Sequence, residues 1–516
     1  MSANNSASAI TLARKLNLLD ATMIVVGSMI GSGIFLTSAE SARLLGAPGW
    51  LVIAWVLAGV MTVTGALCLA EVAAMMPLAG GPYLFLREAY SPALGFLFGW
   101  AQFLVVQTGT IAAVAVAFAN FAGVFFPSIT STNYLIAPIV VGYYAVSLST
   151  QQVVALLVIA ALTLVNLRGL ETGKLIQNVL TLTKTAALLA LVILGLTAGW
   201  QVSHGAGAVF SSAWWNPAAN GWNLQNAQPA AAAAGSLGFL LVLGRAMTGP
   251  LFSQSAWNNV TFTAGEVENP GRNLPRALLV GCFIVVVLYV LANVGYVITL
   301  PLSAIQNAPQ NRVATAVMER IFGAPGVALM AAAIMISTFG CNNGLILAGA
   351  RVYYAMARDK LFFAHLATIN SRGVPAAALL WQGVWASLLV LPRTVTYGAD
   401  AAQQPVFGNV YTQLLEYIVS VELVFGALSV LALIVLRYRQ PDAPRPYRTW
   451  GYPFVPLVFL TLSVFLIISL ALLAPGTSGI GYLIALTGIP VYFIWRRRAA
   501  QNLTTETNQI KQITDD

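Results

Sequence analysis

Two glycine-rich stretches interrupt apolar segments of this sequence that are otherwise long enough to cross a membrane. Residues 27–35 read GSMIGSGIF, and residues 249–258 read GPLFSQSAWN. A break in a spanning helix frees backbone N–H and C=O groups that lipid cannot satisfy, so it is tolerated only where it lines protein or water. The half-helix ends at such a break can bind charged groups, because their free backbone groups and the helix dipole point into the gap.

The chemistry of the two breaks suits one ligand that carries both charges. Free N–H groups and the positive end of a half-helix favour a carboxylate. Free carbonyls at the facing end favour an ammonium group. An α-amino acid carries these two groups close together, so the breaks predict a site for an α-amino acid without defining its side chain. Breaks in corresponding spans of two repeats point to the binding site of a membrane transporter.

Lys184, Arg245, Glu416 and Glu422 are among the charged side chains that lie inside apolar stretches, where a charge is costly and is by default a candidate for function. Lys184, within TLTKT, serves either function or a structural contact with backbone carbonyls. Arg245 precedes Phe252 by seven residues, so the two share a helix face, with Arg245 about 10 Å further out. A salt bridge from Arg245 to Glu416 above Phe252 would make an outer gate, and a packing ion pair or headgroup contact is the alternative. Glu422 lies on a different face of the helix from Glu416. If Glu416 serves the gate, Glu422 could bind substrate or a proton.

The composition places these residues in a membrane protein. Apolar residues make up 58% of the 516 residues and charged residues 8%, whereas soluble domains have about 45–50% and about 25%. A soluble chain of this length cannot bury so much apolar surface, and disorder would need low hydrophobicity and high net charge. The composition therefore excludes a soluble enzyme and favours one polytopic membrane domain.

The net charge of +9 does not indicate a nucleic-acid partner. Lys and Arg occur in short clusters between apolar runs, which is the pattern of a bilayer protein rather than of a basic patch. The three cysteines lie in apolar runs without a CxxC pair, and there are only two histidines. No Walker motif is present, so ATP is not expected. We therefore expect no metal, no cofactor and no nucleic acid.

Twelve apolar stretches approach the length of about 20 residues that a spanning helix needs. Their approximate bounds are 18–45, 50–76, 92–126, 151–168, 174–199, 235–262, 274–299, 325–356, 376–396, 409–436, 453–474 and 478–495. The segment 127–147 is apolar enough to form a short extra helix. The fold class predicted is thus an all-α, polytopic membrane protein with about 12 transmembrane helices.

The distribution of Lys and Arg predicts the orientation. With the N-terminus inside and alternating spans, 19 basic residues fall in inner segments and four in outer ones, a strong positive-inside bias. Residues 1–17 carry no cleavage pattern of a signal peptide, so we expect cytoplasmic tails at 1–17 and 499–516 and a single transmembrane domain at 18–498. The predicted outer loops lack Asn-x-Ser/Thr, which favours a bacterial inner membrane.

Several motifs resemble the amino acid–polyamine–organocation superfamily. Residues 27–35 resemble its first-helix signature, and EVENPGRNLPR at 266–276 resembles its L-type amino acid transporter branch. Further matches are PLAGGPY at 77–83, Asn343-Gly344 with Ala350-Arg351, and RPYR at 445–448. These motifs occur in the expected order over roughly residues 15–450.

The resemblance implies an inverted repeat of five helices plus five, with helices one and six unwound at mid-membrane. The repeats would cover 18–199 and 235–436, and two extra helices would cover 453–495. The resemblance further implies alternating access and sodium-independent transport of amino acids.

The resemblance also assigns roles to individual residues. The substrate carboxylate would meet Ser32 and the amides around Gly31 and Gly33, and the ammonium would meet the main-chain carbonyls of Met29, Phe252 and Ser255. Phe252 would close over the substrate as the outer gate. Cys341 and Asn342 would line the side-chain pocket. Lys184 matches a lysine of sodium-independent relatives, which stands where sodium-coupled relatives hold an ion.

Some residues depart from the pattern of the family. Asn342 is an amide where the family often has a small residue, and Ser253-Gln254-Ser255 is more polar than usual. Both differences favour small or polar neutral substrates over large aromatic ones. The outer connection 127–150 has no cysteine, whereas mammalian relatives use one there to bond a heavy chain. No disulfide-linked heavy chain is therefore expected.

Charged residues also gather at the predicted inner ends of the spans. Glu266 and Glu268 could form a network with Arg272, Arg276 and Arg358. Such a network would break as an inner gate opens, and ordinary surface pairing is equally compatible with the sequence.

The leading hypothesis is a secondary transporter of neutral L-amino acids that works by exchange or proton coupling. A cationic amino acid or polyamine permease is the alternative, which would need pocket carboxylates, and only Glu416 and Glu422 are available. A membrane enzyme would need a His/Asp-type pair within reach, and no nucleophile motif surrounds His204 or His365. An amino acid sensor would usually add a signalling domain, for which the tails are too short.

Overall fold

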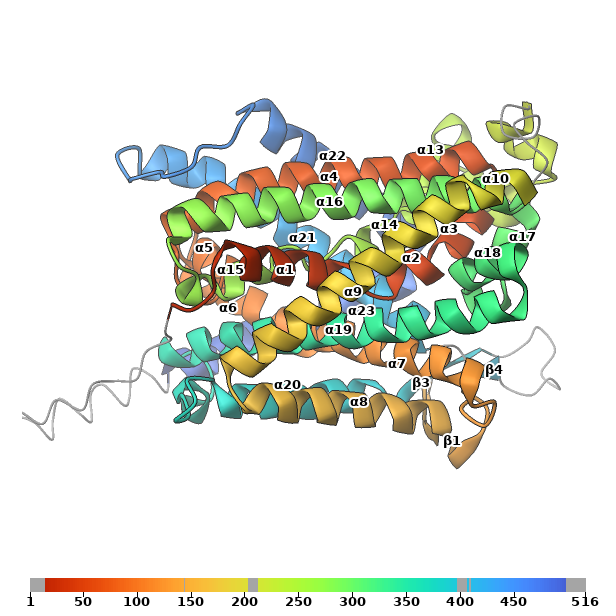
Figure 1. Ribbon diagram of the computed structural model, residues 1–516. Coiled ribbons are helices and arrows are strands. Elements are labelled where there is room, and N and C mark those ends of the chain that lie inside the picture. The colour runs from red at the N-terminus through yellow and green to blue at the C-terminus, as the bar shows by residue number, and fades with distance from the viewer. Residues whose placement is uncertain (1–13, 143, 203–211, 397–405, 408–409, 498–516) are drawn as a thin grey trace, which may run out of the picture.

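The computed structural model describes residues 14–142, 144–202, 212–396, 406–407 and 410–497. In these ranges the helices run along a common axis and form one bundle (Figure 1). Ten helical segments are long and apolar enough to cross a membrane, and two further apolar helices, Gly238–Ser253 and Ala376–Leu389, are shorter. Each of them overlaps one of the twelve predicted stretches, so the prediction of a polytopic helical membrane protein is confirmed.

Several spans consist of more than one helical segment. The first five spans are α1 (Leu18–Met29) with α2 (Gly33–Leu36) and α3 (Ser38–Leu45), α4 (Pro48–Met75), α6 (Pro92–Ala101) with the π-helix η1 (Gln102–Val106) and α7 (Gln107–Phe125), α8 (Thr150–Leu167), and α9 (Leu170–Leu196). The next five are α13 (Gly238–Ala246) with α14 (Thr248–Ser253) and α15 (Asn259–Phe262), α16 (Pro270–Thr299), α19 (Ala324–Arg358), α20 (Ala376–Leu389) and α21 (Val410–Arg439). The last two are α22 (Phe454–Leu473) and the segment that starts with α23 (Pro475–Leu486).

Shorter elements connect the spans. The α-helices are α5 (Pro82–Ala89), α10 (Ala198–Val202), α11 (Leu224–Ala227), α12 (Pro229–Ala232), α17 (Leu302–Gln306) and α18 (Val313–Phe322). The 3₁₀ turns are η2 (Ser212–Trp214), η3 (Pro217–Asn220), η4 (Gly235–Leu237), η5 (Ala264–Glu266), η6 (Pro309–Asn311) and η7 (Ala364–Ala367).

Several spans start with residues that favour the beginning of a helix. The Asn17 side chain accepts from the N–H of Asp20, and Asp20 accepts from the N–H of Asn17, which forms a capping box at α1. Ser149 and Gln152 form a second capping box at α8. Proline stands in the first turn of α4, α6, α16, α19 and α23, where its missing N–H is not needed.

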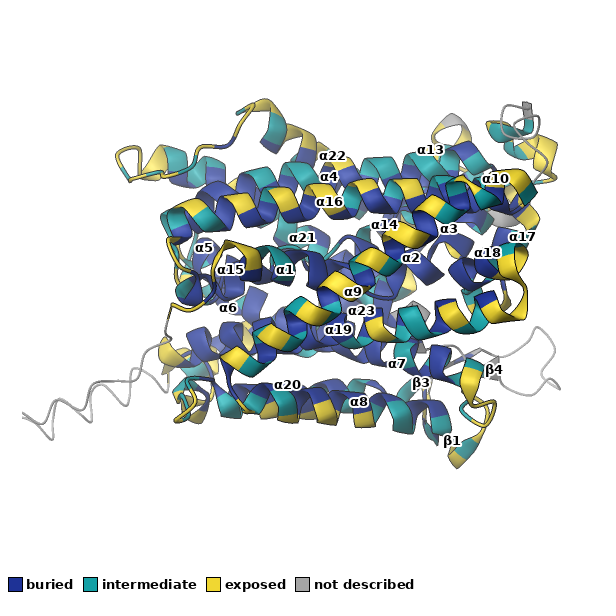
Figure 2. Ribbon diagram, in the orientation of Figure 1, coloured by how far each residue is buried: buried dark blue, intermediate teal, exposed yellow. Residues whose placement is uncertain are grey.

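The outside of the bundle is apolar, as expected where lipid replaces water. On α9, Leu175, Val179 and Leu182 are exposed, whereas Lys184 is buried on the opposite side. Figure 2 shows exposed residues along the outward sides of α9 and α16. On this helix the buried lysine therefore points into the bundle, and apolar side chains form the outward face that suits lipid.

A small sheet at one end of the bundle departs from the sequence prediction. Its strands are β1 (Tyr134–Val141), β2 (Tyr144–Ser149), β3 (Pro392–Thr396) and β4 (Val406–Phe407), each antiparallel to the next. The helix predicted within 127–147 is therefore wrong, since β-branched residues favour a strand and Pro138 would interrupt a helix. The ninth span, predicted over 376–396, ends as a helix at Leu389 and continues as β3. We call this end of the bundle the sheet end and the opposite end, which holds α5 and α15, the α5 end (Figure 1).

A buried ion pair closes the α5 end. Arg351 donates from Nε to Glu266 (2.8 Å) and from Nη2 to its other oxygen (3.0 Å), and both side chains are about 1% exposed. The N–H of Leu16 donates to the Glu266 carbonyl (2.9 Å), so the start of span one is tied to the end of span six. The partner of Glu266 is thus Arg351 and not the arginines that the sequence suggested. The reason is that Arg351 lies 85 residues away and reaches Glu266 only through the packing of α19.

A second polar contact at the α5 end joins α5 to the end of α19. The Tyr83 hydroxyl donates to Asp359 (2.6 Å), which also pairs with Arg87. Burial, and then the hydrogen bond to Asp359, raises the pKa of Tyr83. The phenol therefore keeps its proton and remains the donor of this contact.

The substitution Glu266→Gln tests the buried ion pair. It keeps the shape of the side chain but leaves the buried Arg351 guanidinium without a countercharge. Breaking such a pair costs about 3–5 kcal/mol, so the melting temperature of the purified protein in detergent should fall by several degrees. The exposed neighbour provides the control, because Glu268→Gln should leave the melting temperature unchanged. Equal melting temperatures for the two variants would contradict a stabilising role of the pair.

Candidate functional site

Span one is interrupted in the middle of the bundle. Helix α1 ends at Met29 and α2 begins at Gly33, and the two lie end to end between the other helices (Figure 1). Ile30 has φ −74° and ψ 88°, which is not a helical conformation. The break lies inside the predicted run 27–35 and is fully buried.

Side chains from three other spans satisfy the carbonyls at the end of α1. The Lys184 ammonium donates to the Gly27 carbonyl, and the Cys341 thiol donates to the Ser28 carbonyl (3.1 Å). The Tyr289 hydroxyl donates to the Met29 carbonyl (2.8 Å). The Ser337 hydroxyl donates to the carbonyls of Ile30 and Gly31 (3.2 and 3.3 Å). By contrast, none of the backbone hydrogen bonds found in the described ranges uses the N–H of Ser32 or Gly33. The break therefore offers free donors to a ligand, which suits a carboxylate.

Span six is interrupted at the same depth. Helix α14 ends at Ser253 and α15 begins at Asn259. Ala256 has φ +64°, so the chain turns there in a conformation that side chains rarely adopt. The Ser255 hydroxyl donates to the carbonyl of Phe252 (2.8 Å).

The two breaks touch each other because Gly33 has no side chain. A Cβ at Gly33 would lie 2.2 Å from the Ser253 hydroxyl oxygen and 2.8 Å from the Ser253 Cα. The Thr37 hydroxyl donates to the Gly33 carbonyl (2.9 Å) and lies 3.2 Å from the Ser253 hydroxyl. A glycine at position 33 is thus required for α2 and α14 to approach this closely.

A small cavity lies between the breaks. Eight of the nine residues predicted to bind substrate line it, namely Met29, Gly31, Ser32, Gly33, Phe252, Ser253, Ser255 and Cys341. The volume of the cavity is about 10 Å³, which is room for about one water. An α-amino acid would fit between the breaks only if this cavity widened.

The ninth residue, Asn342, does not line this cavity. Its side chain is fully buried, and neither atom of its amide has a hydrogen-bond partner within the described ranges. Cys341, which precedes it on α19, turns its thiol to the broken span. Neighbouring residues on a helix point about 100° apart, so the two side chains face different neighbours. The role expected for Asn342 in the pocket has no support from its position.

Aromatic rings close the cavity toward the sheet end. Phe252 packs edge to face on Tyr411, with 6.2 Å between ring centroids, and the Tyr411 hydroxyl lies 3.1 Å from the Ser32 hydroxyl. Further toward the sheet end, Arg245 Nη2 lies 3.7 Å from Glu416 Oε1. The two charged residues predicted to pair above Phe252 are therefore neighbours.

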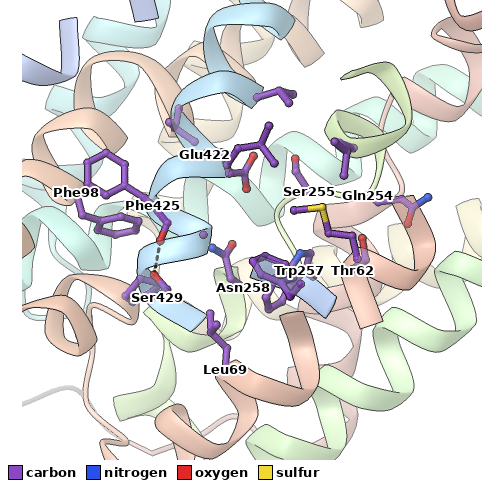
Figure 3. Close-up of a pocket in the computed structure, with 18 of the residues that line it drawn as sticks. Thr62, Leu69, Phe98, Gln254, Ser255, Trp257, Asn258, Glu422, Phe425 and Ser429 are labelled. Atoms are coloured by element: carbon purple, nitrogen blue, oxygen red, sulfur yellow. Dashed lines mark hydrogen bonds between the residues drawn. The ribbon is translucent and has the colours of Figure 1, made fainter. Parts of the chain in front are cut away.

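A larger pocket of about 70 Å³ adjoins the cavity, and Ser255 lines both. Figure 3 shows the Glu422 carboxylate near Ser255 in this pocket, with Asn258 and aromatic rings on the remaining wall. The backbone of Ala256 interacts with the Glu422 carboxylate. Among the residues that the structure describes, no Lys, Arg or His forms an ion pair with Glu422. Of the described residues that line the pocket, Glu422 is the one that can carry a charge.

Lys184 lies beside the broken span. Its side chain is 1% exposed, and its ammonium donates to the Gly27 carbonyl and lies 3.5 Å from the Ser337 carbonyl. The ammonium thus stands at the C-terminal end of α1, where the helix dipole favours a positive charge.

Comparison with known proteins identifies the family. The amino acid permease family matches residues 16–495. The chain belongs to the amino acid permease family. It is 29% identical to the human large neutral amino acids transporter small subunit 2, over 95% of this chain and 82% of that protein. It is 27% identical to a serine/threonine exchanger of Bacillus subtilis (95% and 98% covered) and 27% identical to the mouse Asc-type amino acid transporter 1 (95% and 83% covered).

These matches confirm the resemblance to the L-type branch and show that this permease is a transporter and not an enzyme. In the ranges that the structure describes, no three His, Cys, Asp or Glu side chains come together as a metal site.

The sequence does not reveal three residues of the permease site. Tyr289, Ser337 and Tyr411 contribute the hydroxyls that contact the broken span. Each lies about 260 or more residues from the first break along the chain, on a span with no glycine-rich interruption or buried charge next to it. A single hydroxyl on an apolar helix carries no local signal, so only the packing of the helices could reveal these residues.

The substitution Gly33→Ala tests the close approach of the two breaks. The added methyl group would collide with Ser253, so the cavity could no longer close around a substrate. We expect uptake of labelled amino acid into proteoliposomes to fall at least tenfold. Gly476→Ala is the matched control, because a Cβ at this exposed glycine meets open space, and it should transport normally. Normal uptake by Gly33→Ala would show that the contact is not needed.

Proposed function

We propose that this permease carries neutral L-amino acids across the membrane by alternating access and without sodium. The observation that carries the proposal is the closed cavity between two broken spans, with the free N–H groups of Ser32 and Gly33 at its wall. Relatives named for large neutral amino acids and for serine and threonine support this substrate class.

The substrate would lie with its carboxylate on Gly31, Ser32 and Gly33. Its ammonium would reach the carbonyls of Met29, Phe252 and Ser255. The Met29 carbonyl already accepts from Tyr289, and the Phe252 carbonyl accepts from the Ser255 hydroxyl. Since a carbonyl has two lone pairs, a rotation of the Ser255 hydroxyl would free one for the ammonium.

The side chain of the substrate would face Cys341 and the hydroxyls of Ser253 and Ser255. These polar groups favour small or polar neutral side chains, such as those of serine and threonine. Phe252 would act as the gate toward the sheet end, with the Arg245–Glu416 pair above it. The Lys184 ammonium would hold the end of α1 without an ion, which is why no sodium is expected.

Exchange is the mode we propose, and one observation favours proton-coupled uptake as a second candidate. Glu422 faces the pocket beside the cavity, without an ion pair in the described ranges. A lone charge at membrane depth is costly, and a proton removes that cost. In this second mode Glu422 would take up the proton that moves with the amino acid.

We further propose that the α5 end faces the cytoplasm, together with the tails 1–17 and 499–516. The bias of Lys and Arg toward this side supports the orientation. Residues 18–199 and 235–436 would act as the two repeats of the domain 18–498, with 453–495 beside them, in a bacterial inner membrane. Because 127–150 has no cysteine, the permease would work without a disulfide-linked heavy chain.

Uptake into proteoliposomes tests the proposal. Labelled L-serine, L-threonine, L-leucine, L-phenylalanine, L-arginine and putrescine would be offered to empty vesicles, to vesicles preloaded with unlabelled amino acid, and to vesicles with an inward proton gradient. We expect uptake of the small neutral amino acids only after preloading, without sodium. Uptake of arginine or putrescine alone, or no uptake in any condition, would overturn the proposal.

The variant Glu422→Gln separates the two modes in the same assay. If exchange operates, the amide should leave preloaded uptake and its pH dependence within about twofold of the original protein. If proton coupling operates, uptake driven by the gradient into empty vesicles should be lost while exchange persists. Gradient-driven uptake that survives in Glu422→Gln would exclude this residue as the proton carrier.

A charge reversal tests the gate pair. The pair is about one quarter exposed, and such pairs contribute up to about 1 kcal/mol, so Arg245→Glu or Glu416→Arg should each change the exchange rate by about fivefold. The double variant should return toward the original rate, because it restores opposite charges. Arg320→Glu, at an exposed residue, is the control and should have no effect. A double variant no better than either single variant would speak against the gate.

A further inference from the structure

The strand β1 presents apolar side chains to the outside of the protein. It is the edge strand of the sheet, and Leu135, Ile139 and Val141 are each more than 60% exposed. An exposed apolar edge strand in water invites aggregation, and large exposed apolar patches mark contact sites. In a membrane protein the ordinary neighbour of such a surface is lipid.

The sheet begins at the depth of the bilayer, because the ninth span stops early as a helix. The 14 residues of α20 cover only about 21 Å, whereas the hydrocarbon core is about 30 Å thick. Strand β3 continues the span, and its pairing with β2 and β4 satisfies its backbone, which lipid could not do. The wall of the bundle at this height is therefore made of strands rather than of a helix.

Beneath the sheet lies an apolar groove of about 460 Å³, a size within the range of ligand sites. It is bounded by η1, α20, α21, α23 and the first three strands. It runs from Leu104, near the middle of the third span, to Val141 and Arg393 at the sheet. Apart from Arg393, Tyr144 and Tyr417, every side chain that lines it is aliphatic.

Arg393 is a buried cation without an acidic partner. Its side chain lines the groove although the residue is only 4% exposed. Nη2 donates to the Ser131 carbonyl (2.8 Å) and to the Ser149 hydroxyl (3.2 Å), and the Tyr134 ring lies over the guanidinium. Nε has no hydrogen-bond partner, and no carboxylate pairs with Arg393 in the part of the chain that the structure describes. The guanidinium thus places a positive charge with an unused donor in the wall of the groove at its sheet end.

We propose that this groove binds one phospholipid from the leaflet at the sheet end. One acyl chain would lie along the groove toward Leu104, and the phosphate would lie against the Arg393 guanidinium. The apolar lining matches the acyl chain, and the guanidinium, whose shape and charge suit a phosphate, matches the headgroup. The proposal is independent of the amino acid that the permease carries.

Native mass spectrometry of the purified permease tests the site, with palmitoyl-oleoyl-phosphatidylglycerol added to the detergent. We expect one lipid to remain bound to the original protein. Ile484→Trp, which fills the groove from α23, should reduce the bound fraction at least fivefold. Leu483→Trp is the matched control, because this neighbour on α23 is 65% exposed and does not line the groove, and it should bind normally.

Two further measurements test whether Arg393 binds the lipid phosphate and whether lipid is the molecule that fills the groove. Arg393→Gln should weaken retention of phosphatidylglycerol at least fivefold, and a diacylglycerol with the same chains, which lacks the phosphate, should bind no better to the original protein than to this variant. Equal retention of lipid by Ile484→Trp and Leu483→Trp would overturn the site. The original protein could instead form dimers without bound lipid, and Ile484→Trp could abolish these dimers. That result would overturn the lipid site and show that a second copy of the chain covers the groove.

Discussion

The backbone carbonyls released at the end of α1 are the constraint on which the rest of the site depends. Lipid cannot satisfy these groups, and an unpaired buried polar group costs about 1–3 kcal/mol, so five consecutive free carbonyls would be incompatible with a stable fold. Lys184, Tyr289, Cys341 and Ser337 provide the donors. They lie on α9, α16 and α19, so the same bonds position three helices around the break. Among the described residues, no backbone hydrogen bond uses the N–H groups of Ser32 and Gly33, which are the donors that we propose for the substrate carboxylate.

The two ends of the bundle are closed by contacts of different strength. At the α5 end, Glu266 and Arg351 form a bidentate pair that is nearly inaccessible to solvent, and losing one member of such a pair costs about 3–5 kcal/mol. At the sheet end, Arg245 and Glu416 lie 3.7 Å apart and are about one quarter exposed, which corresponds to at most about 1 kcal/mol. Under the alternating access that we propose, separating the pair at the sheet end would therefore cost less than separating the pair at the α5 end.

Charges within the bundle fall into two groups. Glu71 accepts from Arg437 and from the N–H of Thr449, both at 2.6 Å, and such a fully paired charge is part of the structure. Glu422 and Arg393 lack an opposite charge in the ranges described, and each faces a pocket. An uncompensated charge at membrane depth is costly, so these two positions are where a ligand of opposite charge, a proton or a phosphate, would stabilise the protein.

The resemblance of its motifs to a family gave most residues of the cavity, and the patterns of the sequence itself determined the membrane class, the apolar spans and both breaks. These properties are local, because an apolar run of sufficient length and a glycine-rich interruption are visible within about 30 residues. The tertiary structure alone decided the partner of Glu266, the direction of Asn342, and the roles of Tyr289, Ser337 and Tyr411, since these depend on helices that meet across 85 to 379 residues. It also decided that residues 134–141 form a strand. That stretch is as apolar as a helical span, and its pairing with β2, which in turn pairs with β3 from the distant ninth span, is what satisfies its backbone.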